Sequence, residues 1–336
     1  MRVLIIGGTG LISTPLTRYL LERGDEVVLF NRGKTEARIP TGAKCVIGDR
    51  REFATFENTV RELGWFDVVV DMVCFKPDEA ESVVRAFAGR CGQVVFCSTV
   101  DVYAKPPASY PVREDQYRAA IGDYGINKVK CEDVFFQAHY RGDFPVTIIR
   151  PAHTYGEGGM IIHTFGWSPF PLKRLREGKP IIVHGDGQSL WVSCHVDDVA
   201  MAFFNALGNS AAFGKAYHTT GEEWNSWDRY HEIIAQALGA PKPKLVHIPA
   251  ELLVKASDDC WVTYLNFQYT NIFDNTAANR DLGFQPTISL LEGAKRNIAW
   301  MDAKGMIEYC PPHPKYDTIL SAWETLGSAL VKTVKG

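Results

Sequence analysis

Short runs of hydrophobic residues alternate with longer stretches of mixed polarity through the first half of the chain. Six of these runs are predicted β-strands: Val3–Ile6, Val27–Phe30, Cys45–Ile47, Val68–Val73, Val94–Cys97 and Val146–Ile149. Helical patterns lie between several of them, at Pro15–Arg23, Glu79–Ala88 and Gly125–Tyr140. Continuous Val- and Ile-rich strands separated by helices are typical of a parallel sheet covered on both faces. The pattern therefore predicts an α/β fold with a doubly wound parallel sheet.

The pattern loosens after Pro151, where loop-like stretches separate fewer regular elements. The stretch "GKPIIVHGDGQ" predicts a strand and a tight turn, and "HVDDVAMAFFNAL" predicts an amphipathic helix. Further helices are predicted near Trp227–Leu238 and Leu290–Asp302. We therefore predict a first domain over residues 1–156, to which residues 190–215 return. Residues 157–189 and 216–336 are predicted to form a smaller α/β substrate-binding domain.

The composition of the chain disfavours a nucleic-acid-binding protein, a membrane protein and a metal-binding protein. The 336 residues are 46% hydrophobic and 22% charged, with a net charge of −3, as in an ordinary globular protein without the basic footprint of a nucleic-acid binder. Eight cysteines form no CxxC pair and several lie in hydrophobic runs, which predicts reduced thiols and a cytoplasmic location. The first hydrophobic run is too short to span a membrane, and the histidines show no metal-ligand spacing. We therefore expect no membrane contact and no metal.

Three glycines follow the first strand directly. In "IIGGTGLIS", Gly7, Gly8 and Gly10 stand between a strand and a helix. Glycines there permit a tight turn and let backbone N–H groups approach a pyrophosphate, which the helix N-terminus then faces. The pattern predicts a dinucleotide site, with a small Ser13 where a third glycine is usual. Expected cofactor contacts in this stretch are Gly7, Gly10, Leu11 and Ile12.

The end of the second strand bears on the choice between NAD and NADP. Folds that prefer NAD place an acidic residue there, on the ribose 2′-hydroxyl, but this chain has Asn31 followed by Arg32. An arginine can bind a 2′-phosphate, so the sequence favours NADP modestly over NAD, although a solvated loop cation is the alternative. Asp49, after the third strand, could accept a hydrogen bond from the adenine amino group. Arg50 and Met72 are further expected cofactor contacts.

A tyrosine and a lysine four residues apart are the main candidates for chemistry. Tyr124 and Lys128 fall on one face of the predicted helix. A nearby ammonium group favours the phenolate and lowers the tyrosine pKa, and the lysine can also bind the nicotinamide ribose. Ser98 and Thr99 follow the fifth strand, where hydroxyl groups would open onto the cofactor. The sequence thus predicts a site in which Thr99 orients a substrate hydroxyl for Tyr124.

With these residues the chain resembles the extended short-chain dehydrogenase/reductases, in particular the NAD-dependent epimerase/dehydratase group. The resemblance covers roughly residues 1–300. Its motifs are "GGTGLIS", "GDR", "STVDVY", "YGINK", "RPAHTYG", "GDGQSLWVSCHVDD" and "DNTAANRDLGFQP". It implies a Rossmann-type domain with a small C-terminal substrate domain, and Thr99, Tyr124 and Lys128 as the catalytic trio. It also implies a homodimer formed through the helices Glu79–Ala88 and Gly125–Tyr140.

Three departures from the family pattern affect the expected reaction. Dehydratases of the group carry an Asp-Glu pair after the catalytic threonine, where this chain has Val100 and Asp101. His153 replaces the Asn of the family motif, and Trp191 replaces an arginine that grips the substrate diphosphate. Arg174 or Arg280 could supply that charge instead. A subgroup with a similar "NRGK" loop includes plant plastid stem-loop RNA-binding proteins.

Two further acid–base candidates come from these departures. Asp101 or His153 could move a second proton, although Asp101 could instead cap a turn and His153 could be an ordinary buried histidine. The expected substrate contacts are Ser98, Tyr103, His153 and Trp191.

We therefore expect an NAD(P)-dependent epimerase of a sugar or nucleotide sugar, which acts through transient oxidation of a secondary hydroxyl. An NADPH-dependent ketone or sugar reductase is one alternative. A non-catalytic RNA-binding member of the same fold is another, which the intact Tyr124–Lys128 pair and the acidic composition disfavour.

Overall fold

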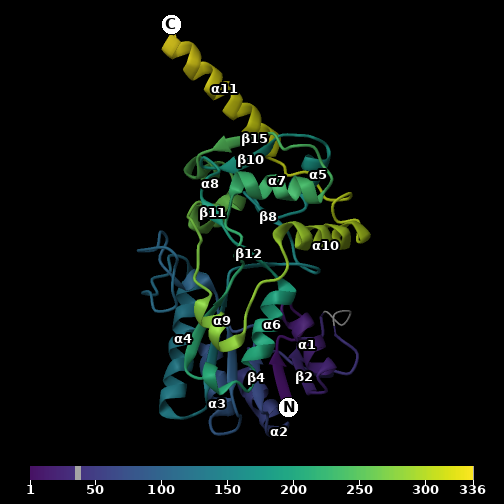
Figure 1. The fold of residues 1–336 in the computed structure, drawn as a ribbon, viewed down its shortest axis with the longest axis vertical. Helices are drawn as coiled ribbons and strands as arrows, with labels where there is room; N and C mark the ends of the chain where they lie inside the picture. Colours follow the sequence, from purple (N-terminus) through teal and green to yellow (C-terminus); the bar gives the residue numbers. More distant parts are fainter. Residues whose placement is uncertain (35–38, 336) are drawn as a thin grey trace. The chain divides into compact units, whose positions relative to one another are not determined.

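The computed structural model describes residues 1–34 and 39–335 and divides into two compact units (Figure 1). Unit 1 comprises Met1–Thr154, Ser193–Glu222 and Ile272–Ile288, and unit 2 comprises Tyr155–Val192, Glu223–Asn271 and Ser289–Gly336. The expected boundary at residues 215/216 falls inside a strand of the main sheet. Residues 272–288, assigned to the second domain from the sequence, belong to unit 1.

Unit 1 is built on a seven-stranded sheet with the order β13-β6-β5-β4-β1-β2-β3. All its neighbouring strands pair in parallel. The strands are β1 (Arg2–Ile6), β2 (Glu26–Asn31), β3 (Lys44–Ile47), β4 (Val68–Asp71), β5 (Val94–Cys97), β6 (Val146–Pro151) and β13 (Lys215–Thr219). The order reverses at β1, which is the point where doubly wound sheets bind ligands at their carboxyl edge. The predicted Rossmann-type fold is confirmed.

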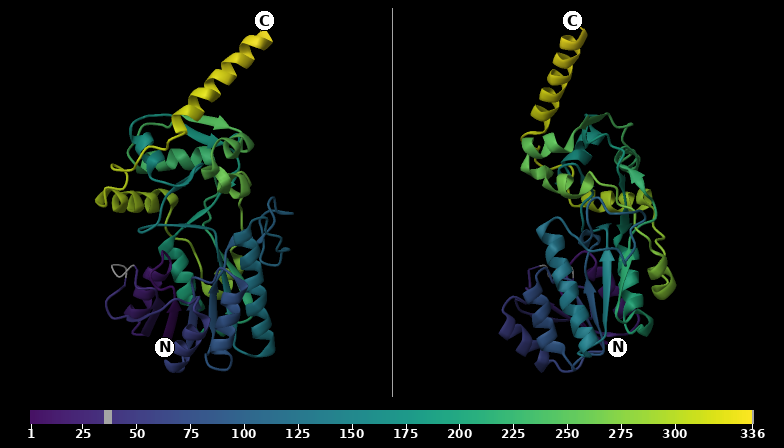
Figure 2. Two further views of the ribbon diagram at one scale, coloured as in Figure 1. Left: turned by 180° about the vertical axis from the view of Figure 1, so that it is seen from behind. Right: turned by 90° about the vertical axis from the view of Figure 1, so that its left-hand side faces the viewer.

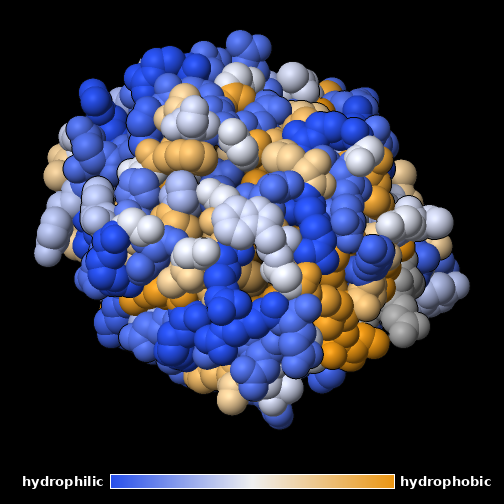
Figure 3. Space-filling view, turned by 90° about the horizontal axis from the view of Figure 1, so that it is seen from below, coloured by the Kyte–Doolittle hydropathy of each residue, from blue (hydrophilic) through white to orange (hydrophobic). Residues whose placement is uncertain are grey.

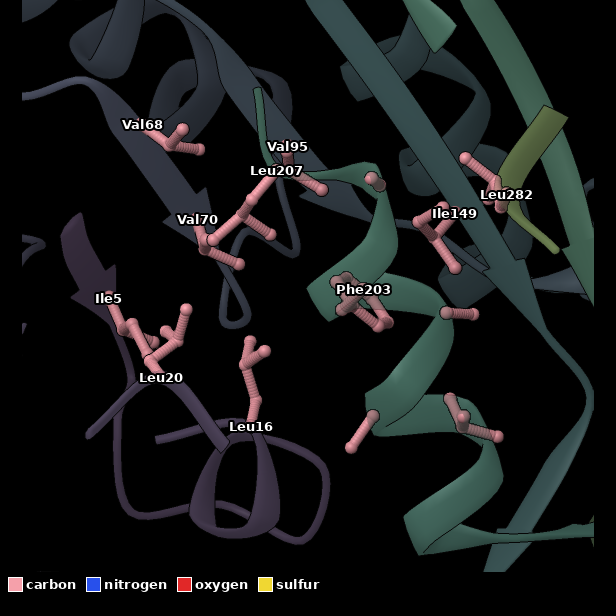
Figure 4. Close-up of a cluster of buried hydrophobic side chains, with 14 of the residues drawn as sticks. Ile5, Leu16, Leu20, Val68, Val70, Val95, Ile149, Phe203, Leu207 and Leu282 are labelled. Atoms are coloured by element: carbon pink, nitrogen blue, oxygen red, sulfur yellow. The ribbon is translucent and has the colours of Figure 1, made fainter. Parts of the chain in front are cut away.

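Helices cover both faces of this sheet because successive strand residues point to opposite sides. One face packs on α1 (Ser13–Glu22), α6 (Val196–Ala206) and α9 (Thr276–Leu282), and the other on α2 (Phe53–Glu62), α3 (Pro77–Phe87) and α4 (Asp123–Arg141). Ile5 therefore lies with Leu16 and Phe203 in the first layer (Figure 4), whereas Leu4 faces the second. Both sides of each central strand are buried, which explains the continuous hydrophobic runs.

Helix α2 has no counterpart in the prediction. It buries only Phe56, Glu57 and Val60, so it lacks the wide hydrophobic stripe by which a helix is recognised from sequence.

The edge of unit 1 at which the strands begin shows mainly hydrophilic residues with hydrophobic ones between them (Figure 3). The glycine loop and the hydroxyls of Ser98 and Thr99 all follow the carboxyl ends of strands, at the opposite edge. Shortly after β6, the strand β7 (His153–Tyr155) pairs with β12 (Ser193–His195) in a separate two-stranded sheet. The candidate chemistry of unit 1 is therefore concentrated where the parallel strands end.

Unit 2 is a smaller α/β assembly of short strands. Its strands are β8 (Ile162–His163), β9 (Gly166–Trp167), β10 (Ile181–His184), β11 (Leu190–Trp191), β14 (Asn225–Ser226) and β15 (Leu245–Ile248). Its helices are α5 (Phe170–Arg176), α7 (Trp227–Ala237), α8 (Ala250–Ala256), α10 (Leu290–Ala303) and α11 (Tyr316–Lys335). Strands β10 and β15 pair in parallel, and β11 pairs antiparallel with β14. Within the described parts of the chain, no helix combines the length and hydrophobicity needed to cross a bilayer.

Candidate active site

The glycine loop between β1 and α1 is held in shape by its own residues. Gly7 has a φ of +87°, and a Cβ there would overlap the side chain of Val73, so only glycine fits. The Ser13 hydroxyl accepts from the Gly10 N–H at 2.8 Å and donates to the Gly7 carbonyl at 2.9 Å. Ser13 thus closes the turn where a third glycine is usual. Gly10 is exposed and leaves the loop open to a ligand.

A pocket of about 260 Å³ opens beside this loop. It is lined by Ile6, Gly7, Thr9, Gly10, Phe30, Asn31, Arg32, Lys34, Gly48, Asp49, Arg50, Arg51, Val73, Phe75 and Glu79. The expected contacts Gly7, Gly10, Asn31, Arg32, Asp49 and Arg50 are all among them. Val73, Phe75 and Glu79 were not expected, because nothing in the sequence shows that the loop after β4 folds over the glycines.

The pocket lining fits the adenosine half of a dinucleotide. The Asn31 Oδ1 accepts from the Gly33 N–H at 2.9 Å, while its buried Nδ2 has no hydrogen-bond partner among the described residues. A buried donor without a partner is costly unless a ligand satisfies it. The exposed Arg32 and Lys34 follow directly. Asn31 can therefore donate to a ribose oxygen, with two cations close by in the chain.

Arg50 has a structural role in addition to its place in the pocket lining. Its Nη1 donates to both carboxylate oxygens of Asp71, at 2.7 and 2.8 Å, and its Nη2 donates to the Glu79 carbonyl. Both members of the ion pair are buried. The pair ties the ends of β3 and β4 together, which limits the freedom of Arg50 to follow a ligand.

The remaining expected cofactor contacts lie outside the pocket lining. Met72 and Ile12 pack against the hydrophobic core of unit 1, and Met72 donates its N–H to the Ile6 carbonyl. Leu11 is half-buried just before α1.

Thr99, Tyr124 and Lys128 come together from two elements. Thr99 follows β5 and begins a short 3₁₀ helix, Val100–Val102, by accepting from the Asp101 N–H at 3.2 Å. Tyr124 and Lys128 lie in the first turns of α4, which packs on this 3₁₀ helix. A Cβ on Gly125 would overlap the Asp101 carbonyl oxygen. The glycine of "YGINK" is therefore needed for the close approach that puts the Tyr124 hydroxyl beside Thr99, to which it is hydrogen bonded.

Lys128 does not act on Tyr124 in the way expected from the sequence. Its buried ammonium donates to the Cys97 carbonyl at 2.7 Å and lies 5.8 Å from the centre of the Tyr124 ring. Although 46% of Tyr124 is exposed, burial around the hydroxyl raises its pKa; the charges of Cys97 and Asp101 add to the rise and the hydrogen bond with Thr99 opposes it. The expected lowering of the tyrosine pKa is thus absent while the ammonium is held by the Cys97 carbonyl.

Asp101 and Lys105 form a pair that was not predicted from the sequence. The Lys105 Nζ lies 3.7 Å from Asp101 Oδ1, and only 5% of the Lys105 side chain is exposed. Burial lowers the pKa of Lys105, and the Asp101 carboxylate opposes that shift. The i, i+4 spacing was the available signal. Since Asp101 also influences the pKa of Tyr124, the pair belongs to the surroundings of the candidate base.

His153 lies on β7 and is bound to the neighbouring strand. Its Nδ1 and the Ser193 hydroxyl are 2.8 Å apart. Ser193 was not singled out from the sequence, because it lies 40 residues away along the chain. The hydrogen bond with Ser193 holds the His153 ring in one orientation, as a proton-transferring histidine requires.

Two of the expected substrate contacts are engaged in a buried polar network instead. Ser98 is 2% exposed and donates to Glu132 Oε1 at 2.6 Å. Tyr103 is also 2% exposed, and its hydroxyl accepts from Arg150 at 2.6 Å and contacts His218 Nε2 at 2.8 Å. Both hydroxyls are already satisfied inside unit 1. In the structure these two side chains thus support the site from within unit 1, and their expected contact with a substrate stays a prediction.

Glu132 is the centre of this network. Its carboxylate accepts from Ser98, from Arg150 at 2.8 and 2.6 Å and from Arg118 at 2.9 Å. Burial alone would raise the pKa of Glu132, but the Arg150 guanidinium and the hydrogen bonds lower it below its ordinary value. The network joins the ends of β5 and β6 to α4, and so holds Thr99 against Tyr124.

Trp191, in unit 2, is also a core residue. It is 5% exposed, and its ring lies 5.1 Å from that of Trp227 and 4.9 Å from that of Phe267. Arg174, suggested as a substitute diphosphate ligand, is buried and donates to Asp317 at 2.7 Å. Neither side chain is thus presented as a substrate contact. Over the described ranges, no group of three or more metal-binding side chains is found.

Comparison with known proteins identifies the family of this chain. The family model "NAD dependent epimerase/dehydratase family" matches residues 3–219. The chloroplast stem-loop binding protein of 41 kDa b of Arabidopsis thaliana is 28% identical over an alignment of 309 residues that covers 87% of this chain and 77% of that protein. The 2′-dehydrokanamycin reductase of Streptomyces kanamyceticus is 27% identical over 274 residues, 82% of this chain and 77% of the reductase.

Solved structures show the same fold. UDP-glucose 4-epimerase of Thermotoga maritima superimposes with a TM-score of 0.73 at 18% identity, over 90% of this chain and 99% of the epimerase. UDP-glucuronic acid 4-epimerase of Bacillus cereus, in complex with NAD, superimposes with a TM-score of 0.71 at 18% identity, over 90% of this chain and 99% of that epimerase. The chain belongs to the NAD-dependent epimerase/dehydratase family and is an NAD(P)-dependent enzyme of the extended short-chain dehydrogenase/reductase type.

Proposed function

We propose that this protein is an NAD(P)-dependent epimerase of a sugar or nucleotide sugar, acting through transient oxidation of a secondary hydroxyl. The observation that carries the proposal is the hydrogen-bonded pair of Thr99 and Tyr124 hydroxyls beside Lys128. Thr99 follows the carboxyl end of β5, two strands from β1 and its glycine loop in the sheet order, and α4 supplies Tyr124 and Lys128. Family members such as the UDP-glucose and UDP-glucuronate 4-epimerases support the substrate class.

Each residue has a defined task in this proposal. A bound nicotinamide would supply the acceptor for the hydrogen on the substrate carbon. Thr99 Oγ1 orients the substrate hydroxyl, and Tyr124 Oη takes its proton. Because burial raises the pKa of Tyr124, the phenolate needs a nearby positive charge. We infer that Lys128 leaves the Cys97 carbonyl in the working enzyme and supplies that charge.

The second proton transfer is assigned to Asp101 or His153. Asp101 is held beside the trio by Lys105, and His153 by Ser193. Val100 stands where dehydratases of the family have a carboxylic acid, so net loss of water is not expected. The transient ketone is instead reduced on its other face, or epimerised at a neighbouring carbon.

A reductase is the second candidate. It is favoured by the similarity to 2′-dehydrokanamycin reductase over 82% of this chain and by the cations at the adenosine end of the pocket. An enzyme that consumes NADPH could use Thr99, Tyr124 and Lys128 in the same roles.

We expect catalysis to be redox-neutral. UDP-glucose and UDP-glucuronate, each incubated in deuterated water with a catalytic amount of cofactor, should be converted to their epimers without net change in absorbance at the NAD(P)H band. Deuterium next to the transient ketone would indicate enolisation, and inversion without exchange would indicate return of hydrogen to the opposite face. Stoichiometric oxidation of NADPH by a sugar ketone, without epimer formation, would contradict the proposal and favour the reductase.

We also propose that the pocket prefers NADP to NAD, because Asn31 stands where an NAD-specific carboxylate would be and the exposed Arg32 and Lys34 follow it. Arg32→Ala should weaken NADP(H) binding by about tenfold or more, about 1.4 kcal/mol, and leave NAD(H) binding nearly unchanged. Isothermal titration with both cofactors measures this difference. Arg51→Ala is the matched control, because Arg51 lines the same pocket but is paired with Glu79 at 3.1 Å. Equal losses for both cofactors in Arg32→Ala would show that Arg32 does not recognise the 2′-phosphate, and no loss for either would show that it is only a loop cation.

Two other expectations stay as proposals. We propose a homodimer formed through α3 and α4, where Ile126 and Tyr140 are 36% and 77% exposed. All eight cysteines are free thiols, which supports the proposed cytoplasmic location. Binding of nucleic acid, as the name of the chloroplast relative indicates for that protein, is not proposed here, because the net charge is −3.

A further inference from the structure

Helix α11 carries one hydrophobic stripe that is buried at its start and exposed further along. Tyr316 and Leu320 lie in a hydrophobic core of unit 2, and the Tyr316 hydroxyl accepts from the Ile182 N–H at 2.7 Å. Every residue from Glu324 to Lys335 is exposed. The helix extends away from the rest of unit 2 in all three views (Figures 1 and 2).

The exposed half continues the same stripe. Leu326, Leu330 and Val334 follow one another at intervals of four residues, which places them on one helix face, and they are 58%, 65% and 76% exposed. Gly327 lies beside them, and a Cβ added there would meet nothing within 4 Å. A helix of about 12 residues is marginally stable in water unless its hydrophobic face is covered. A partner is therefore expected on this face.

The distribution of charge along the exposed half of α11 favours a second copy of the same helix as the partner. The exposed half begins with the acidic Glu324 and ends with the basic Lys332 and Lys335. In an antiparallel pair of such helices, the acidic start of each lies beside the basic end of the other. In a parallel pair, like charges would meet.

We propose that the exposed half of α11 pairs antiparallel with the same segment of a second copy of this chain. With Leu330 at the two-fold axis, Leu326 lies opposite the partner's Val334 and Glu324 lies next to the partner's Lys335. Gly327 leaves room for the two helices to approach closely. This contact is independent of the reaction that the enzyme catalyses.

A membrane surface is the competing occupant, and the charges disfavour it. Helices that lie on anionic bilayers are rich in Lys and Arg on their polar face. The exposed half of α11 carries only two lysines and one glutamate, and Asp317 in the first turn is already paired with Arg174, so the dense positive charge of such helices is absent.

The test is sedimentation velocity over a range of concentrations, because a contact of this length falls in the class of weak interfaces, below about 1,200 Å². The sedimenting mass of the full-length protein should double with rising concentration. The variant Leu326→Glu/Leu330→Glu should lose that doubling, whereas Ser328→Glu, on the opposite face of the helix, should keep it. Circular dichroism shows whether all three chains are folded. If the smaller particle is already a dimer formed through α3 and α4, it carries two such helices, and its mass should at least double.

Charge reversal tests the direction of the pair. Glu324→Lys and Lys335→Glu should each weaken association, and the double variant should restore it. Absence of recovery in the double variant would overturn the antiparallel arrangement. Equal concentration dependence in wild type and Leu326→Glu/Leu330→Glu would overturn the proposal. Binding of wild type alone to vesicles of phosphatidylcholine and phosphatidylglycerol, without self-association, would assign the stripe to membranes instead.

Discussion

Tyr124→Phe is expected to lower turnover by about 100-fold or more, the usual contribution of a positioned general base, while cofactor binding persists. The substitution removes the hydroxyl that is hydrogen bonded to Thr99 but keeps the ring, which packs 6.5 Å from that of Phe75. Phe75 lines the cofactor pocket, so the pocket wall should be preserved. Turnover of UDP-glucose and UDP-glucuronate, with cofactor affinity measured separately, distinguishes loss of chemistry from loss of binding.

Tyr117→Phe is the matched control. Tyr117 is 87% exposed, so loss of its hydroxyl should leave turnover within a factor of two or so of wild type, as expected for surface substitutions. If Tyr124→Phe retained full turnover, the proton acceptor would have to be another group, and His153 would be the next residue to replace.

Glu132→Ala is expected to lower the free energy of unfolding by about 3–5 kcal/mol, as removal of one partner from a buried ion pair does. The carboxylate is completely buried and is the common acceptor for Arg150, Arg118 and Ser98. Its loss leaves the Arg150 guanidinium, 3% exposed, without its main counter-charge. Urea unfolding followed by circular dichroism measures the change.

Asp133→Ala provides the comparison on the next residue of the same helix. Asp133 accepts from Arg118 at 2.6 Å but is 45% exposed, so its removal should cost about 0–1 kcal/mol. Equal destabilisation by the two variants would show that the network contributes nothing beyond a surface pair.

The pH dependence of stability provides an internal check on the Glu132 assignment. The folded-state pKa of Glu132 is lowered, so its contribution is fully present above the unfolded pKa of about 4.3 and is lost as the pH falls through the folded value. The free energies of unfolding of wild type and Glu132→Ala should therefore differ most at neutral pH and converge in strong acid.

Much of unit 1 could be predicted from the sequence. Central strands of a parallel sheet are buried on both faces, so Leu4 and Ile5 are both hydrophobic although they face different helices. The same burial makes each strand a continuous run that is recognisable without a structure. The glycine loop was equally clear, because a positive φ and a close backbone approach allow only one residue type at Gly7.

The candidate site was only partly predictable. Tyr124 and Lys128 lie on one helix, so their proximity follows from helical geometry alone. The direction in which the Lys128 side chain points does not follow from helical geometry, since its ammonium is held by the carbonyl of Cys97, 31 residues earlier. The sequence also contains no sign that Val73 and Phe75 would line the pocket, because their position depends on how the loop after β4 folds against Gly7.

The fold class, the position of the glycine loop and the three catalytic candidates could all be derived from the sequence, because each follows from local pattern. The partners of the polar side chains could be found only from the folded chain. Ser98 and Tyr103 follow the same strand as Thr99, yet their hydroxyls bind Glu132, Arg150 and His218, which lie 34 to 115 residues further along the chain. Such partners meet only when strands and helices pack, because burial requires every polar group to find a hydrogen bond wherever the fold supplies one.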